Sequence, residues 1–402
     1  MVRVVDLAVR LKRLPWASAV GFGLVAALAY HVSIPLETAA NQYVHLADAF
    51  LSGRTYLVDP PPYLELTRVG DHHYVIPPPL PAVLLLPYVA VAGTGASQTL
   101  AAAAAGGLNG LVSFLIAARM VERRADQTWL AILCAFGTIV WHLAAVGSMW
   151  FIAHVIATLA LNLALLETLG QRRPVLIGLG IAAAFWTRLP TLLALPFFAL
   201  MTWDRWAPDG LRQWRTIRLG YLNALVAPIA AAVVLNFGYN WLRFETIADV
   251  AYRLRNNASL EPWFARGLMH LSYIPRHLHP LMLATPIVTA TAPWVTWSLG
   301  GLAIWVTTPA ILFGLRAPLD ALSTWAAWAG ILPTALAVMS HGSTGMEQFG
   351  YRFAVDFYPL LLFLTMSGMR APLRPVHRVA IAASVLVNLW GVVWTRMGWA
   401  VL

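Results

Sequence analysis

The sequence has little charge and almost no cysteine. Charged residues make up 11% of the 402 positions, against about 25% in soluble domains. Cys134 is the only cysteine, so neither a disulfide framework nor a multi-cysteine metal site can form. Apolar residues account for 59% of the chain, and the mean hydropathy is +0.69. These values exclude a soluble enzyme and a disordered protein, and they predict an all-α, polytopic membrane protein.

Apolar segments are numerous enough to predict about eleven transmembrane helices. They lie near residues 15–35, 98–118, 127–146, 150–169, 175–188, 190–203, 219–237, 296–314, 320–340, 355–369 and 379–395. The first mimics a secretory signal, but the ten segments behind it favour an uncleaved anchor. Residues 77–93 are also apolar, yet prolines open and interrupt them, so we expect a helix at the outer interface. The whole chain, 1–402, is then one transmembrane domain with large outer loops at 36–97 and 238–295.

Arginine and lysine are concentrated in short loops that we place on the cytoplasmic side, together with the N-terminus. These loops contain 17 of the 27 basic residues, as the positive-inside rule requires. They are Arg3, Arg10, Lys12, Arg13, Arg119, Arg123, Arg124, Arg172, Arg173, Arg205, Arg212, Arg215, Arg218, Arg316, Arg370, Arg374 and Arg378. The net charge of +10 therefore indicates topology and contact with anionic lipid, and no nucleic-acid partner is expected. Ten of the 17 acids lie in or beside the outer segments, so any chemistry is expected there.

Two carboxylates of the first outer loop are candidate general bases. Apolar residues at helical spacing over 43–51 predict a helix along the membrane surface, with Asp48 on a different face. Glu65 lies in an apolar Tyr-Leu-Glu-Leu run, and apolar surroundings raise the pKa of a carboxylate and suit it to act as a base. The alternative is that Asp48 and Glu65 only form ion pairs with Arg54 and Arg68.

Two arginines interrupt apolar sequence at the outer face. Arg188 is followed by Leu-Pro, and an arginine at this depth is costly unless it reaches water, a carboxylate or a phosphate. We interpret it as a ligand of a lipid phosphate, with simple snorkelling as the alternative. Arg352 and Asp356 are spaced i,i+4, which on an α-helix places them on one face. They form either a structural pair or a unit in which Asp356 orients Arg352 toward an anion.

Histidines near the outer face have both structural and functional interpretations. His142, Trp150 and His154 lie at the outer ends of consecutive segments, and they form either hydrogen bonds between helices or the wall of an outer-leaflet cavity. His72-His73 and His277-x-His279 are weak metal candidates, because no cysteine can join them and adjacent histidines rarely bind one ion. Contact with headgroups or phosphate is favoured, so no metal ligand is assigned.

Five sequence motifs occur in a familiar order. They are Tyr43 to Arg54, Pro77-Pro78-Pro79-Leu80, GLGIAAAFWTRLP at 178–190, NWLRF at 240–244 and GYRFAVDFYP at 350–359. Their order over nearly the whole chain resembles the GT-C superfamily of membrane glycosyltransferases, in particular a bacterial subgroup of the family 39 and protein O-mannosyltransferase-like group. In that family an Asp-Glu pair at the positions of Ala39 and Ala40 is catalytic. The resemblance therefore implies either a different base, at Glu37, Asp48 or Glu65, or a protein that does not catalyse transfer.

The resemblance implies a glycosyltransferase of the bacterial inner membrane with an extracytoplasmic active site. Its donor would be a polyprenyl-phosphate-linked sugar, and its acceptor a hydroxyl of a glycan, lipid or protein. We expect inverting transfer, in which Glu65 or Asp48 accepts the acceptor proton and Arg352, Arg188 and Arg243 hold the lipid phosphate. The supporting residues in this hypothesis are Asp356, His154, Tyr43 and Tyr351. Whether a divalent metal is required is left open.

Two other functions fit the same sequence. One is a transporter or flippase of a lipid-linked or anionic solute, which usually shows internal repeats and broken helices at mid-depth. The other is a non-catalytic, lipid-binding membrane subunit, which the alanines at positions 39 and 40 favour. A blind cavity that opens to the outer leaflet would favour the transferase, and a path through to the cytoplasm would favour transport.

Overall fold

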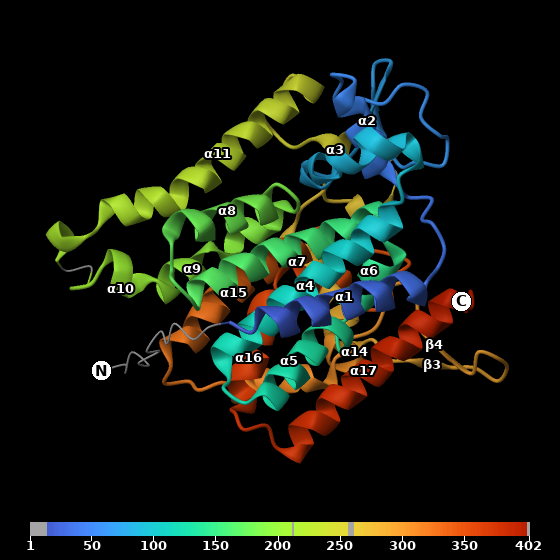
Figure 1. Cartoon of the computed structure of the whole chain (residues 1–402). Coiled ribbons are helices and arrows are strands. Elements are labelled where there is room, and N and C mark those ends of the chain that lie inside the picture. Colours follow the sequence, from blue (N-terminus) through green and yellow to red (C-terminus); the bar gives the residue numbers. More distant parts are fainter. Residues whose placement is uncertain (1–13, 211–212, 256–260, 400–402) are drawn as a thin grey trace.

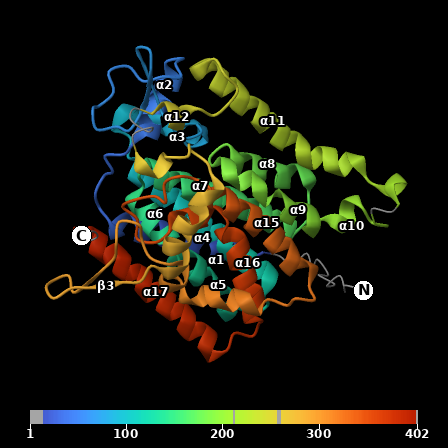
Figure 2. The same cartoon turned by 180° about the vertical axis from the view of Figure 1, so that it is seen from behind.

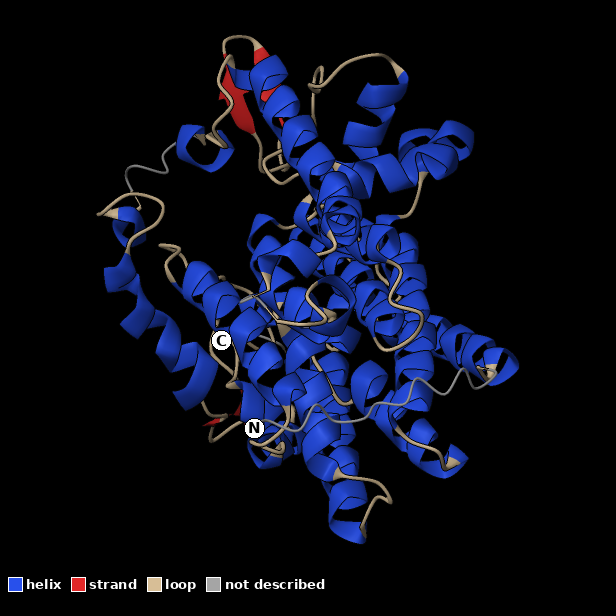
Figure 3. Ribbon diagram, turned by 90° about the vertical axis from the view of Figure 1, so that its left-hand side faces the viewer, coloured by secondary structure: helices blue, strands red, loops and turns tan. Residues whose placement is uncertain are grey.

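Long apolar helices make up most of the computed structural model, which describes residues 14–210, 213–255 and 261–399. The helices pack side by side in a bundle, and the strands are confined to short hairpins (Figure 1, Figure 3). The predicted cytoplasmic residues Arg3, Arg10, Lys12, Arg13 and Arg212 lie outside the described ranges. The predicted fold class is confirmed, and the protein is an integral membrane protein.

Within the described ranges, six helices are long and apolar enough to cross a membrane. They are α1 (Trp16–Ser33), α4 (Gln98–Met120), α7 (Met149–Thr168), α11 (Leu219–Phe244), α15 (Leu322–Met339) and α17 (Pro375–Arg396). Helices α5 (Arg124–Phe136) and α6 (Val140–Val146) meet at a 52° bend and form a seventh span if counted together. Shorter apolar helices are α3 (Leu80–Ala92), α8 (Pro174–Phe185), α9 (Leu195–Met201) and α16 (Tyr358–Met369). The predicted count of eleven spans is therefore not confirmed.

The segment at 296–314, which we predicted as a span, is not a continuous helix. It begins in strand β4 (Val295–Thr296), which pairs with β3 (Ile287–Val288), and it continues through α14 (Ile304–Thr307) into the 3₁₀ helix η8 (Pro309–Arg316). Gly301 has a φ of +81°, and a proline at position 309 cannot donate the backbone hydrogen bond of a helix interior. This segment therefore does not form the continuous spanning helix that we predicted from its apolar composition.

The first outer loop folds around a short amphipathic helix, as predicted. Helix α2 (Gln42–Leu51) buries Tyr43, Leu46 and Ala47, and Gly53 follows it with a φ of +70°. The strands β1 (Thr67–Val69) and β2 (His72–Tyr74) then form an antiparallel hairpin around the Gly70-Asp71 turn. The remaining short elements are η1 (Gly93–Gly95), η2 (Leu189–Ala194), α10 (Trp203–Trp206), η3 (Trp214–Thr216), α12 (Ala251–Leu254), η5 (Pro262–Phe264), η6 (Leu271–Tyr273), α13 (Ile274–Leu278), the π-helix η7 (His279–Leu283) and η9 (Arg352–Asp356).

Helices α4 and α7 lie at the centre of the bundle. In the most apolar 18-residue stretches of α4 and α7, 67% and 78% of the residues are buried. The corresponding share is only 22% in α1 and in α11. Helices α11 and α17 lie at opposite edges in the views from the front and from behind (Figure 1, Figure 2). Glycines allow α1 to approach α4 closely, because a Cβ at Gly106 would come within 2.8 Å of the Tyr30 ring. The Gly106-x-x-x-Gly110 spacing is typical of membrane helices that pack closely through small residues.

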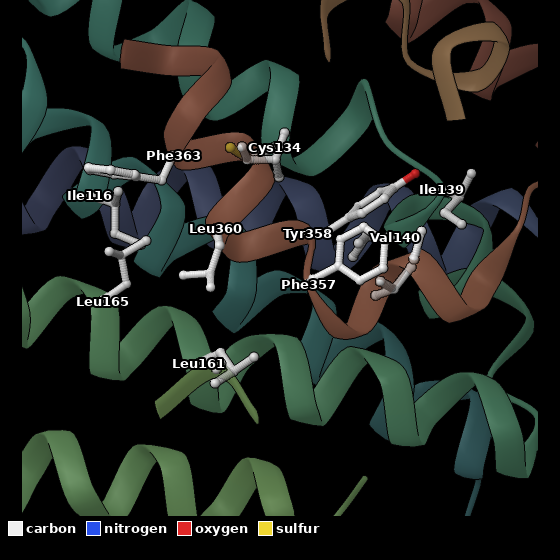
Figure 4. Close-up of a cluster of buried hydrophobic side chains, with 14 of the residues drawn as sticks. Ile116, Cys134, Ile139, Val140, Leu161, Leu165, Phe357, Tyr358, Leu360 and Phe363 are labelled. Carbon is white, nitrogen blue, oxygen red and sulfur yellow. The ribbon is translucent and has the colours of Figure 1, made fainter. Parts of the chain in front are cut away.

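The core of the bundle is filled with apolar side chains. Helix α16 contributes Leu360 and Phe363, which lie among residues of α4, α5, α6 and α7 (Figure 4). A polar pair also lies between the two central helices, where Asn162 Nδ2 donates to Asn109 Oδ1 at 2.7 Å. The middle of the bundle is therefore packed, and the cavities described below lie at helix ends.

Candidate functional site

The segment between α1 and α2 is held against the start of α4. The Gln98 amide accepts from the Tyr43 backbone at 3.1 Å and donates to the carbonyls of Ala40 and Gly147 at 2.9 and 2.8 Å. Glu37 accepts hydrogen bonds from Ser97 Oγ and from the Thr99 backbone, so its carboxylate caps the N-terminus of α4. These contacts fix the positions of Ala39 and Ala40, and they assign Glu37 a structural role.

An apolar cavity and a polar cavity meet where the helices end. The apolar cavity has a volume of about 340 Å³, and its wall includes Pro77, Pro78, Leu189, Pro190 and Met269. The polar cavity has a volume of about 520 Å³, and its wall includes Ala39, Ala40, Glu65, Arg255, Glu261, Glu347 and Arg352. Trp150, Tyr252, His341 and Phe353 line both cavities. We call these four shared residues the waist.

The cavity walls come from one end of the bundle. Ser148 and Trp150 lie at the start of α7, Arg188 follows α8, and His341 follows α15. The opposite ends of the same helices lead into the arginine-bearing segments at 172–173 and 316–321. The cavities therefore lie on the side away from the basic loops.

Glu65 lies in the polar cavity and forms an ion pair that the sequence did not indicate. Its partner is Arg255, which also pairs with Glu261, and Trp263 Nε1 donates to the second oxygen of Glu261 at 2.7 Å. The Glu65 side chain is 30% exposed, so solvent or a substrate can reach it. The expected alternative, pairing with Arg68, is not observed, since Arg68 lies 3.5 Å from Asp71. Glu65 thus shares a cavity with the alanines at the positions of the family's carboxylates.

Arg188 reaches the wall of the apolar cavity while bound to a buried carboxylate. Its Nε and Nη2 donate to Asp356 at 2.9 and 2.8 Å, and His154 Nδ1 lies 2.9 Å from the same carboxylate. Asp356 and His154 are completely buried, whereas the Arg188 side chain is 19% exposed. The site thus joins three of the predicted residues, and the cavity-facing guanidinium edge of Arg188 remains able to donate.

The expected pairing of Arg352 with Asp356 is wrong. Residues 352–356 form a 3₁₀ helix, in which three residues make a turn, so residues spaced i,i+4 do not share a face. Arg352 Nη1 instead donates to the Met346 carbonyl at 2.7 Å, and its guanidinium lies 5.6 Å from the Phe151 ring and 5.5 Å from the Phe353 ring. Burial lowers the pKa of Arg352. Among the described residues it has no carboxylate partner, so it brings an unpaired positive charge to the polar cavity.

Other predicted residues lie outside these cavities. Asp48 lines neither cavity. Arg243 is buried, donates to the Val75 carbonyl at 2.9 Å and lies 3.9 Å from the Tyr239 ring, so it ties α11 to the first outer loop. Tyr43 is buried in α2, and Tyr351 is bonded to His277 Nδ1 at 2.7 Å. None of these four residues lines either cavity.

Of the residues predicted at the outer ends of consecutive segments, His142 and His154 form hydrogen bonds within the protein, and only Trp150 lines the cavities. His142 Nε2 bonds Thr395 at 3.1 Å, which is the contact between helices considered above. Trp150, in contrast, is a cavity wall residue. Over residues 14–210, 213–255 and 261–399, no group of three or more histidine, cysteine or acidic side chains is arranged to hold a metal ion.

Sequence reasoning missed the waist residues Tyr252, His341 and Phe353, as well as Arg255. Tyr252 and Arg255 lie in or directly after a four-residue helix in the second outer loop, where no periodic pattern indicates which side chains turn inward. His341 does carry a signal, because it begins a polar, glycine-containing stretch directly after an apolar helix. Such a stretch at a helix end is a common place for functional side chains.

No protein-family model and no curated protein matches the sequence. Among solved structures, ArnT from Cupriavidus metallidurans bound to undecaprenyl phosphate is similar over 90% of this chain, with a TM-score of 0.52 and 14% identity. The Archaeoglobus fulgidus oligosaccharyltransferase is similar over 97% of this chain, with a TM-score of 0.52 and 12% identity. The chain covers 61% and 57% of these two proteins. Both are GT-C superfamily membrane glycosyltransferases. The chain therefore has the GT-C fold, as its sequence resemblance predicts.

Proposed function

We propose that this protein transfers a sugar from a polyprenyl-phosphate-linked donor to an acceptor hydroxyl at the outer face of the bacterial inner membrane. The observation that carries the proposal is the meeting of an apolar and a polar cavity at a waist flanked by Arg188 and Arg352. A lipid-linked sugar has the same order of parts, namely an apolar chain, an anionic phosphate and a polar sugar. The fold shared with ArnT, which was solved with undecaprenyl phosphate, supports this proposal.

The donor would lie across the waist. Its polyprenyl chain would contact the apolar cavity, whose proline wall at Pro77 and Pro78 belongs to the first outer loop. Its phosphate would lie between Arg188 and Arg352, where charge-assisted hydrogen bonds in a partly dry site are strong. We propose that residues 1–402 act as one transmembrane domain, with the loops at 36–97 and 238–295 closing this site.

Glu65 is the carboxylate that we assign as general base. The acceptor oxygen would attack the anomeric carbon and give its proton to Glu65, while the bond from that carbon to the phosphate oxygen breaks. The lipid phosphate leaves as an anion that the guanidinium groups stabilise, and one direct displacement inverts the anomeric centre. Because Asp48 does not line the polar cavity, it stays a prediction from the sequence and has no part in this mechanism.

Transport is less consistent with the same geometry. The cavity walls come from helix ends on one side, and the middle of the described bundle is filled by the apolar core and by the Asn109–Asn162 pair. The positive-inside rule places the basic loops in the cytoplasm and hence the cavities on the outer side. A blind outer cavity suits bond formation better than passage of a solute.

The test is transfer from undecaprenyl-phosphate sugars in proteoliposomes, with an acceptor mixture of glycans and lipids. We expect turnover by the wild type and a loss of 10²- to 10⁴-fold in Glu65→Gln, because general-base catalysis contributes about this much. Arg352→Ala should also lose activity through a raised KM for the donor.

Matched controls separate these effects from loss of structure. Asp71→Asn changes an exposed carboxylate of the same loop, and Arg68→Ala removes its arginine partner, so both should keep wild-type activity. Glu261→Gln removes the other carboxylate that contacts Arg255 and should cost less than tenfold. Full activity in Glu65→Gln would eliminate the assigned base, and binding of the donor without any turnover would favour the non-catalytic subunit.

A further inference from the structure

His341 has no role in the mechanism above, although it lies where the two cavities meet. It follows the last residue of α15 by two positions and lines both the apolar and the polar cavity. Its ring is packed edge-on against Tyr252 at 5.5 Å, Phe264 at 5.4 Å and Phe353 at 5.9 Å. The ring is therefore held in a fixed orientation at the waist.

One nitrogen of this ring is occupied and the other is available. Nδ1 lies 2.9 Å from the Ser343 carbonyl and 3.2 Å from the Ser343 backbone nitrogen. Ser343 can therefore accept from Nδ1 or donate to it, and both neutral tautomers of the imidazole are supported. Nε2 has no hydrogen-bond partner within the part of the chain that the structure describes, and a nearby anion would favour the tautomer with a proton on Nε2.

His341 and both candidate phosphate-binding arginines surround a single ring. The guanidinium groups of Arg352 and Arg188 lie 5.5 and 5.7 Å from the Phe353 ring centre, and the His341 ring lies 5.9 Å from it. Burial, together with the charges of His277 and these arginines, lowers the pKa of His341 to about 4. The imidazole is thus neutral at physiological pH and offers one directed hydrogen bond without adding a third positive charge.

We propose that His341 is a third ligand of the lipid phosphate, donating a hydrogen bond from Nε2 beside Arg188 and Arg352. This inference rests on the proposed function, and it adds a residue that would contact the substrate. The two arginines neutralise the charge of the phosphate, whereas the neutral imidazole of His341, held in one orientation, fixes the position of one phosphate oxygen. The bond from the sugar to the phosphate is thereby oriented toward the polar cavity and Glu65.

The experiment measures binding of undecaprenyl phosphate and of undecaprenol, which lacks the phosphate, to the purified protein in detergent. His341→Phe removes the nitrogens and keeps the aromatic contacts, whereas His341→Gln places an amide donor close to the position of Nε2. We expect His341→Phe to weaken binding of undecaprenyl phosphate about tenfold or more and to leave undecaprenol binding unchanged. His341→Gln should recover at least part of the loss.

The outcomes separate this inference from the proposed function. If His341→Phe binds undecaprenyl phosphate as tightly as the wild type does, His341 is not a ligand of the phosphate and the proposal is overturned. If that variant nevertheless loses turnover, His341 has a role in proton transfer instead. An equal loss for both lipids indicates packing and also overturns it. If the wild type binds both lipids equally and Arg352→Ala changes nothing, the proposed function itself fails.

Discussion

Removal of the Asp356 carboxylate should destabilise the protein far more than removal of an exposed carboxylate does. Asp356 is completely buried and accepts from Arg188 at 2.9 and 2.8 Å, with His154 at 2.9 Å. Replacement by Asn leaves the Arg188 charge without a counterion inside the bundle. Loss of one partner of a buried ion pair costs about 3–5 kcal/mol, so we expect Asp356→Asn to lower the free energy of unfolding by about that amount.

The chain offers a matched control for this change. Arg172 Nη1 contacts Asp204 at 3.0 and 3.1 Å, but the Asp204 side chain is 57% exposed. Asp204→Asn should cost only about 0–1 kcal/mol, because solvent screens an exposed pair. Chemical denaturation in detergent micelles measures both variants under the same conditions.

A double replacement tests whether the cost of Asp356→Asn comes from an unpaired charge. Arg188→Met with Asp356→Leu removes both charges, and apolar replacement of a buried pair is often close to neutral. The double variant should therefore be more stable than Asp356→Leu alone. The reasoning is refuted if Asp356→Asn costs no more than Asp204→Asn, or if the effects of the two single replacements simply add.

Two further predictions concern helix packing and pH. Gly107→Ala should destabilise the protein by about 1–3 kcal/mol, because its Cβ would lie 2.5 Å from Ala27 Cβ. Gly21→Ala, on the exposed face of the neighbouring helix α1, has free space and should be neutral or slightly stabilising. Thermal unfolding in detergent compares the two variants, and equal effects would contradict the packing argument. Burial lowers the pKa of His277 from 6.5 to about 4, so the unfolded chain binds a proton over this range that the folded chain does not. His277 should therefore contribute a loss of stability of up to about 3 kcal/mol as the pH drops from about 6.5 to 4. His277→Gln should reduce the pH dependence by this contribution, and an unchanged pH profile in that variant would contradict the assignment.

Composition and local sequence patterns predicted those elements that are determined by residues close together in the sequence. Low charge and high apolar content predicted the helical membrane protein, and the apolar periodicity over 43–51 predicted α2. In each case the residues that determine the structure lie within about one or two helical turns of one another.

The partners of the charged residues depend on contacts that are distant in the sequence. Asp356 binds Arg188 and His154, which are 168 and 202 positions away, and Glu65 binds Arg255, 190 positions away. The spacing of Arg352 and Asp356 indicated a pair only on the assumption of an α-helix, and the backbone there is 3₁₀. Candidate residues could therefore be named from the sequence, whereas their pairing required the tertiary structure.

The pairing of charges argues for the position of the phosphate. Asp356 pairs with Arg188, and Glu65 and Glu261 pair with Arg255, so Arg352 is the cation of the polar cavity that forms no ion pair with a described carboxylate. The wall of this cavity already carries three carboxylates against two guanidinium groups. An Asp-Glu pair in place of Ala39 and Ala40, as in the family that the sequence resembles, would add two negative charges to the same wall. With alanines at these positions the wall has one more carboxylate than guanidinium groups, and in the proposed mechanism Glu65 would accept the proton while Arg352 would hold the phosphate.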